Sequence, residues 1–336
     1  MREKITKMNK RGFQFTFAWM FAIIVGAVVI FLAFYISQKI IATQTTVSGT
    51  EAGLELSTIL TPLENVLDEG RAASIKLNQE TRVFNGCRRP QDLPGTEFGF
   101  QEISTSLKSG VSGWGSPGLP SRFKNKYLFS KATVEGEEYV VLSKSFAFPF
   151  KIASIMILWS ADEKYCFINA PSDVENEIQE LNPKGVYIEA PGAECPANAK
   201  RVCFGSGVGA DCNIQVNEYA KTITHITDFD GARVGYQGSL MYAAIFSDPS
   251  IYECQTERLM ARAHELAEVY IEKTGLLATR GCAFQTVAPY LNSYVIKTQA
   301  YVLEEIEEGQ SINLEPIAQD VREIERANRA LRCELF

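Results

Sequence analysis

The residues best suited by type and spacing to acid–base chemistry are His225, Asp228 and Asp230. A histidine beside carboxylates can accept and return a proton near neutral pH, which is chemistry that hydrolases use. These residues surround the end of a strand predicted at 220–226, where a surface turn uses the same residue types. They are the catalytic candidates of an alternative hypothesis, in which the chain is an extracytoplasmic hydrolase whose active site is assembled from distant residues.

Two further motifs fall short of a recognisable site. His264 and Glu265 begin the pattern H-E-x-x-H, but Glu268 stands where the second histidine is required. His264 and Glu268 could supply two metal ligands from one helix face, although an ordinary pair of helix side chains is the simpler explanation. The glycine-rich stretch 205–209 lacks the Lys-Ser/Thr of a phosphate-binding loop. The sequence therefore assigns no metal and no cofactor, and it favours a role other than catalysis.

The cysteines indicate disulfide bonds rather than metal ligands. The spacing of Cys195, Cys203 and Cys212 matches no C-x₂₋₄-C zinc pattern, and an even number of cysteines in an exported region is typical of disulfides. Cys203 and Cys212 could close a short loop, and Cys254 could pair with Cys282 or Cys333. The eight cysteines are Cys87, Cys166, Cys195, Cys203, Cys212, Cys254, Cys282 and Cys333.

An apolar segment near the N-terminus is the element that places all of these residues. No charged residue lies between Arg11 and Lys39, and a helix of that length crosses a hydrocarbon core of about 30 Å. The residues before it are basic, with Glu3 as the single acid. Because positive charge is retained in the cytoplasm, the sequence predicts a single-pass signal anchor with a cytoplasmic N-terminus and an extracytoplasmic C-terminal domain.

The junction between the leader and the apolar segment resembles a known processing signal. Asn9-Lys10-Arg11-Gly12-Phe13 is similar to the class III signal of archaeal type IV pilin-like proteins, and the resemblance covers about 25 of 336 residues. In that family a membrane peptidase cuts on the cytoplasmic side of the helix. The resemblance implies cleavage between Gly12 and Phe13. Many family members carry a glutamate five residues into the mature chain, whereas this chain has Phe17 there.

The remaining sequence predicts an α+β fold with strands before helices. Residues 84–126 are rich in Gly, Pro and Ser and predict a loop with Trp114 near its tip. Residues 127–146 predict a hairpin that turns at 135–137, within a mainly antiparallel centre. The predicted divisions are a leader at 1–12, a transmembrane helix at 13–41, an amphipathic stalk helix at 42–80, a β-rich region at 81–238 and a helical region at 239–336.

Charge and composition limit the partners. The chain carries a net charge of −7, and beyond the leader no run of Lys and Arg exceeds two residues, which argues against nucleic acid as a partner. The expected partners are the lipid bilayer and, through the stalk helix, a second copy of the chain or another envelope protein. The leading hypothesis is thus a membrane-anchored extracytoplasmic protein with a structural or binding role in the cell envelope. A more specific version of this hypothesis is that the protein is pilin-like.

Overall fold

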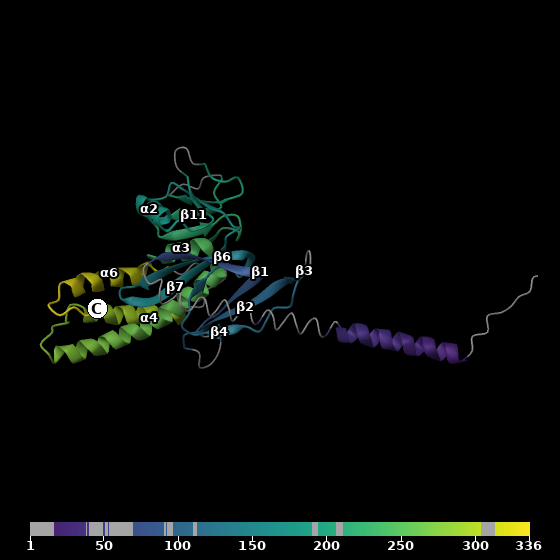
Figure 1. Ribbon diagram of the computed structural model, residues 1–336. Coiled ribbons are helices and arrows are strands. Elements are labelled where there is room, and N and C mark those ends of the chain that lie inside the picture. The colour runs from purple at the N-terminus through teal and green to yellow at the C-terminus, as the bar shows by residue number, and fades with distance from the viewer. Residues whose placement is uncertain are drawn as a thin grey trace, which may run out of the picture.

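The computed structural model describes residues 17–37, 39, 50, 53, 70–90, 92, 97–109, 113–189, 194–205, 211–303 and 313–336. Within these residues the chain forms two β-sheets with helices packed on them, and an N-terminal helix that stands apart (Figure 1). The predicted α+β class is confirmed.

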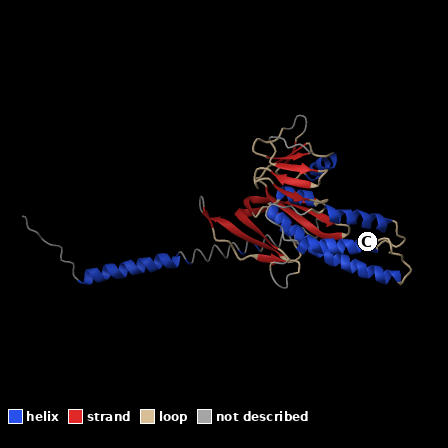
Figure 2. Cartoon of the chain, turned by 180° about the vertical axis from the view of Figure 1, so that it is seen from behind, coloured by secondary structure: helices blue, strands red, loops and turns tan. Residues whose placement is uncertain are grey.

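The N-terminal helix spans Phe17–Ser37 and is long and apolar enough to cross a membrane. Its 21 residues rise about 32 Å, which matches a hydrocarbon core of about 30 Å. None of its apolar window is buried by the rest of the chain, and both views show it extending away from the sheets (Figures 1 and 2). This length and exposure are compatible with a membrane anchor and also with a signal sequence.

The first sheet has seven strands in the order β3-β2-β1-β6-β7-β5, with β4 paired to β2. Its centre is formed by antiparallel pairs of β1 with β6 and of β6 with β7. Successive residues of a strand face opposite sides, so Val140 and Leu142 join the main core while Tyr139 and Val141 join a second apolar cluster. The strands are β1 (Arg71–Arg88), β2 (Phe100–Ser109), β3 (Gly113–Trp114), β4 (Ser121–Phe123), β5 (Leu128–Phe129), β6 (Thr133–Ala147) and β7 (Lys151–Ser160).

Three helices, α4 (Pro249–Ala278), α5 (Ala288–Leu303) and α6 (Glu315–Arg329), pack with this sheet. Helix α4 contacts β1, β5 and β7, α5 packs on α4, and α6 packs on α5. Phe150, in the turn between β6 and β7, joins the sheet to the helices. Its ring centroid lies 4.4 Å from that of Tyr270 on α4 and 6.1 Å from that of Tyr294 on α5.

The second sheet has six strands in the order β13-β12-β11-β10-β8-β9. Helix α3 (Leu240–Phe246) contacts strands of both sheets. Its Phe246 stacks on Trp159 of β7 with ring centroids 4.4 Å apart, so an aromatic contact connects the two sheets through α3. The strands are β8 (Tyr165–Ile168), β9 (Val186–Ile188), β10 (Lys200–Phe204), β11 (Ile214–Asn217), β12 (Thr222–His225) and β13 (Ala232–Gly235), and helix α2 (Ser172–Leu181) lies between β8 and β9 in the chain.

The predicted stalk helix at 42–80 is wrong from residue 71 onward, because β1 begins there. Residues 54–69, which carry most of the helical pattern, lie outside the described part. Within β1 the side chains of Thr81, Val83 and Asn85 are buried in alternation. This period of two follows from hydrogen bonding to β6 on one side and β2 on the other, which overrides local helix propensity.

Residues 84–126 are not a loop, because they include the end of β1 and the strands β2, β3 and β4. Glycine and proline in this region mark the connections between short strands rather than one long excursion. Trp114 lies on β3, and the guanidinium of Arg82 on β1 sits 4.3 Å from its ring centroid. This tryptophan therefore packs on its own sheet.

The predicted hairpin with a turn at 135–137 is also wrong, because β6 is continuous through these residues. Gly136 is buried in the strand opposite Thr81. A Cβ at Gly136 would lie 2.5 Å from Oγ of Ser160, so glycine allows close packing here instead of a turn. The observed hairpin joins β6 to β7.

The centre of the chain is less antiparallel than predicted. In the second sheet β9 pairs with β8, β8 with β10, and β10 with β11, all in parallel. Parallel neighbours need a crossover, and α2 supplies one between β8 and β9. Short strands read singly carry no information about the direction of their neighbours, so the sequence pattern could not distinguish the two arrangements.

The structure pairs all eight cysteines and leaves none free. Cys203–Cys212 forms as the spacing suggested, whereas Cys254 pairs with Cys87 instead of Cys282 or Cys333. The expected pairing of Cys254 within the helical end was wrong because Cys87 at the end of β1 reaches α4 in space, at a Cα–Cα distance of 6.1 Å. The other bridges are Cys166–Cys195 and Cys282–Cys333.

Candidate functional site on helix α4

Helix α4 collects polar groups from distant parts of the chain. It begins at Pro249, a favourable first residue because proline lacks the N–H that a helix start leaves unpaired. One turn later, Cys254 is bonded to Cys87. Arg89 Nη1 lies 2.7 Å from Oε1 of Glu257, so the segment after β1 is fixed to the helix by a covalent bond and an ion pair.

Arg258 is the most buried charged side chain of the site, with 0% of its surface exposed. Its guanidinium donates to the carbonyl oxygens of Phe98 at 3.1 Å, Lys124 at 2.8 Å and Lys126 at 2.9 Å. Burial lowers the pKa of Arg258 to about 10. The guanidinium therefore binds two connecting segments, the one at Phe98 and the one at 124–126, to helix α4 through several hydrogen bonds at once.

Gly99 allows the first of these segments to fold closely. Its φ is +55°, and a Cβ there would meet the carbonyl oxygen of Arg88 at 2.1 Å. An L side chain is strained in this backbone conformation and would also clash with the main chain. The neighbouring Phe98 is thus held where Arg258 can bind its carbonyl.

Glu257 is a buried acid whose protonation changes near neutral pH. Burial raises its pKa to about 7, the charge of Arg89 opposes this shift, and Glu253 and Asp92 add to it. Only 4% of its side chain is exposed. The carboxyl is therefore protonated in part at neutral pH although an arginine lies beside it.

Glu265 lines two cavities. One has a volume of about 260 Å³ and the other about 230 Å³. The larger is lined by Pro90, Glu97, Ala261, His264, Glu265, Gln299, Val302 and Leu303. The smaller is lined by Phe98, Asn125, Tyr127, Arg262, Glu265, Leu266 and Val269. Both combine apolar walls with a few polar groups, which is the composition of small ligand sites.

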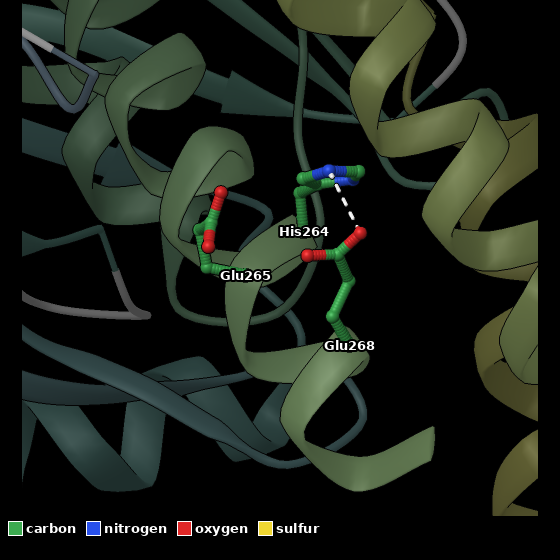
Figure 3. A group of neighbouring side chains, drawn as sticks. All are labelled: His264, Glu265 and Glu268. Atoms are coloured by element: carbon green, nitrogen blue, oxygen red, sulfur yellow. Dashed lines mark ion pairs between the residues drawn. The ribbon is translucent and has the colours of Figure 1, made fainter. Parts of the chain in front are cut away.

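His264, Glu265 and Glu268 form a group of which the first two line the larger cavity. Figure 3 shows the Glu268 carboxylate directed toward the imidazole. The His264 ring contacts the carbonyl oxygen of Val295 on α5 through Nδ1, at 3.1 Å. Its Nε2 lies 3.8 Å from Oε1 of Glu268. One ligand atom from each of the three residues lies within 4.8 Å of the others.

Two of the predicted acid–base candidates, His225 and Asp228, form contacts with other parts of the second sheet or with helix α3. His225 is buried, and its Nε2 lies 2.9 Å from the carbonyl oxygen of Ala244 on α3. Burial lowers the pKa of His225. Burial raises the pKa of Asp228, but the hydrogen bond and charge of Lys200 outweigh it, so the pKa falls below its ordinary value. Asp230 occupies a turn with φ of 49°.

Neither of the two cavities described above includes His225, Asp228 or Asp230. His225 faces the backbone of α3, while Asp228 is paired with Lys200. His225 and Asp228 thus each have a partner within the second sheet and the helix beside it. Gly12 and Phe13, the predicted processing residues, lie outside the described residues, as does the glycine-rich stretch 206–210.

Sequence reasoning missed Arg258, Glu257 and Glu97. The first two lie off the apolar stripe of Leu259, Ala263 and Leu266, at positions where charged residues are expected to be exposed. Glu97 carried no signal, because only the tertiary fold brings it beside α4.

No family model, curated protein or solved structure matches the chain, and its function is inferred from its own residues.

Proposed function

We propose that this chain is a single-pass membrane protein whose disulfide-bonded α+β domain lies outside the cytoplasm and has a structural or binding role in the cell envelope. The proposal rests on two features that occur in the same chain: an apolar helix that the rest of the chain leaves exposed, and a domain whose eight cysteines are all paired in disulfides. Stable disulfides belong to oxidising compartments.

The exposed helix supports lipid as its partner. Phe17, Phe31 and Phe34 expose 80%, 69% and 67% of their surface to whatever surrounds the helix. Each apolar side chain of this size gains about 1.5–3 kcal/mol when it is transferred from water to an apolar phase. The basic leader favours retention of the N-terminus in the cytoplasm.

The two cavities beside Glu265 support a binding role for the domain.

The pilin-like form of the proposal adds cleavage between Gly12 and Phe13, and it is tested by the mass of the membrane-extracted chain. A new N-terminus at Phe13 supports processing, and an intact leader beginning at Met1 refutes it.

Topology is tested on intact cells that express the chain with a C-terminal tag. External protease should remove the tag, and the protein should stay in the membrane pellet after alkaline extraction. All eight cysteines should resist alkylation until a reductant is added. A protected tag together with free thiols would refute the proposed compartment, and release by alkaline extraction would refute the anchor.

The binding role has its own test. Crosslinking of whole cells should join the protein to a second copy or to another envelope protein, and the same crosslink should be lost in detergent-denatured extract. Absence of both self-association and capture would refute this part of the proposal.

A further inference from the structure

His264 presents one ring nitrogen outward from a fixed position. The carbonyl oxygen of Val295, 3.1 Å from Nδ1, can only accept a hydrogen bond, so Nδ1 carries the hydrogen. In the neutral imidazole the other nitrogen, Nε2, then has a free lone pair. A backbone carbonyl that orients the ring in this way is the usual support of a histidine that binds metal.

The free nitrogen faces a carboxylate at a distance that suits a shared ion. Nε2 of His264 and Oε1 of Glu268 are 3.8 Å apart, too far for a direct hydrogen bond. Zinc binds nitrogen and carboxylate oxygen at about 2.0–2.2 Å in tetrahedral geometry, so two ligand atoms of one ion lie about 3.4 Å apart. The 3.8 Å gap is close to this separation, and a small rotation of the half-exposed Glu268 side chain would close it.

A third ligand and an open side complete the arrangement. A ligand atom of Glu265 lies within 4.8 Å of both other ligand atoms, and a side-chain rotation of this exposed residue would bring it to the ion. His264 and Glu265 also line the cavity of about 260 Å³, and Glu97 reaches the same cavity from the segment before β2. A further carboxylate and space for solvent thus lie beside the three ligands.

We propose that His264, Glu265 and Glu268 bind one divalent transition-metal ion, with Zn²⁺ as the ion that this ligand set suits. Calcium prefers six to eight oxygen ligands, whereas one imidazole and two carboxylates match the ligands of zinc sites that keep an open position. The open position faces the cavity. All cysteines are in disulfides, so thiolates do not compete for the metal.

The test measures Zn²⁺ binding to the full-length protein in detergent by equilibrium dialysis with metal analysis. The wild-type protein should bind one Zn²⁺ per chain. Glu268→Gln and His264→Gln should each weaken binding by at least about tenfold, because even the loss of a supporting outer group costs about 10–100-fold. Gln at position 264 retains a donor for the Val295 carbonyl, and Gln at the exposed position 268 removes charge without removing bulk.

Glu272→Gln is the matched control, since it removes the same charge from an exposed position one turn further along α4. It should change the affinity by less than about twofold. Substitution of Co²⁺ for Zn²⁺ should give visible absorption bands that Glu268→Gln abolishes. The proposal is overturned if the wild type binds no stoichiometric Zn²⁺, or if Glu268→Gln and His264→Gln bind as the wild type does. It is also overturned if Glu272→Gln weakens binding as strongly as they do.

Discussion

Replacement of Glu257 by glutamine should remove a pH dependence of stability that the buried carboxyl creates. The pKa of Glu257 rises from an ordinary value of 4.5 to about 7 in the folded protein. The folded state therefore binds more protons than the unfolded state between these values. Stability consequently falls as pH rises through this window, and the penalty is absent below about pH 4 and complete above about pH 7.

The size of the effect follows from the pKa change. Each pKa unit corresponds to about 1.4 kcal/mol, so a shift from 4.5 to about 7 corresponds to about 3 kcal/mol. Glutamine is similar in shape to the protonated acid and does not ionise. We therefore expect Glu257→Gln to exceed the stability of the wild type by less than about 1 kcal/mol near pH 5 and by up to about 3 kcal/mol near pH 8.

The assay is thermal unfolding of both full-length proteins in the same detergent from pH 5 to pH 8. For a domain of this size 3 kcal/mol corresponds to roughly 6–12 °C in Tm. His225 has a lowered pKa and acts in the opposite direction, because its stabilising neutral form is lost as pH falls. Its contribution is common to both proteins and cancels in their difference.

Glu272→Gln serves as the control, since Glu272 is exposed on the same helix, and its difference from the wild type should stay flat across this range. A flat difference between the wild type and Glu257→Gln would refute the reasoning. So would an NMR titration in which the Glu257 carboxyl ionises near pH 4.5.

Three further predictions concern the groups that build the site. Arg258→Met should lower the free energy of unfolding by about 3–5 kcal/mol, measured in urea, because its carbonyl partners lose a buried donor; a loss below about 1 kcal/mol would contradict this role. Gly99→Ala should destabilise the protein by more than about 1 kcal/mol through a positive φ and a backbone clash, whereas Gly275→Ala, with open space around it, should be neutral or stabilising. Replacing both cysteines of a bridge by serine should lower the free energy of unfolding by about 5 kcal/mol for Cys87–Cys254, which spans 167 residues, and by about 3 kcal/mol for Cys203–Cys212, which spans 9. Equal losses in the same urea unfolding assay would contradict the argument from loop length.

The sequence predicted those features that depend on residues close together in the chain. Phe17–Ser37 is helical because its apolar composition is local information. Helix α2 carries its own local signals, an acidic first turn and the Asn182-Pro183 stop, and Asn182 adopts the left-handed conformation that ends it. Helix α4 continues through Gly275 to Ala278, because glycine inside a helix costs only about 1 kcal/mol.

Local pattern failed wherever the partner segment decided the structure. Residues 71–76 become a strand because β6 pairs with them, and Gly136 stays in a strand because Ser160 approaches it closely. The spacing of Cys254 suggested Cys282 or Cys333, yet the fold brings Cys87 to it. These outcomes depend on free energies gained across the chain, which a short window of sequence does not contain.

The sequence by itself determined the candidate membrane helix, the even set of cysteines and the presence of His264, Glu265 and Glu268 on one helix. Only the tertiary structure decided that Val295 orients the imidazole, that Glu97 lines the same cavity and that Arg258 fastens two segments to α4. Helical periodicity places neighbouring side chains on one face, whereas a cavity needs walls from distant segments. Those walls exist only after the sheet and the helices have packed.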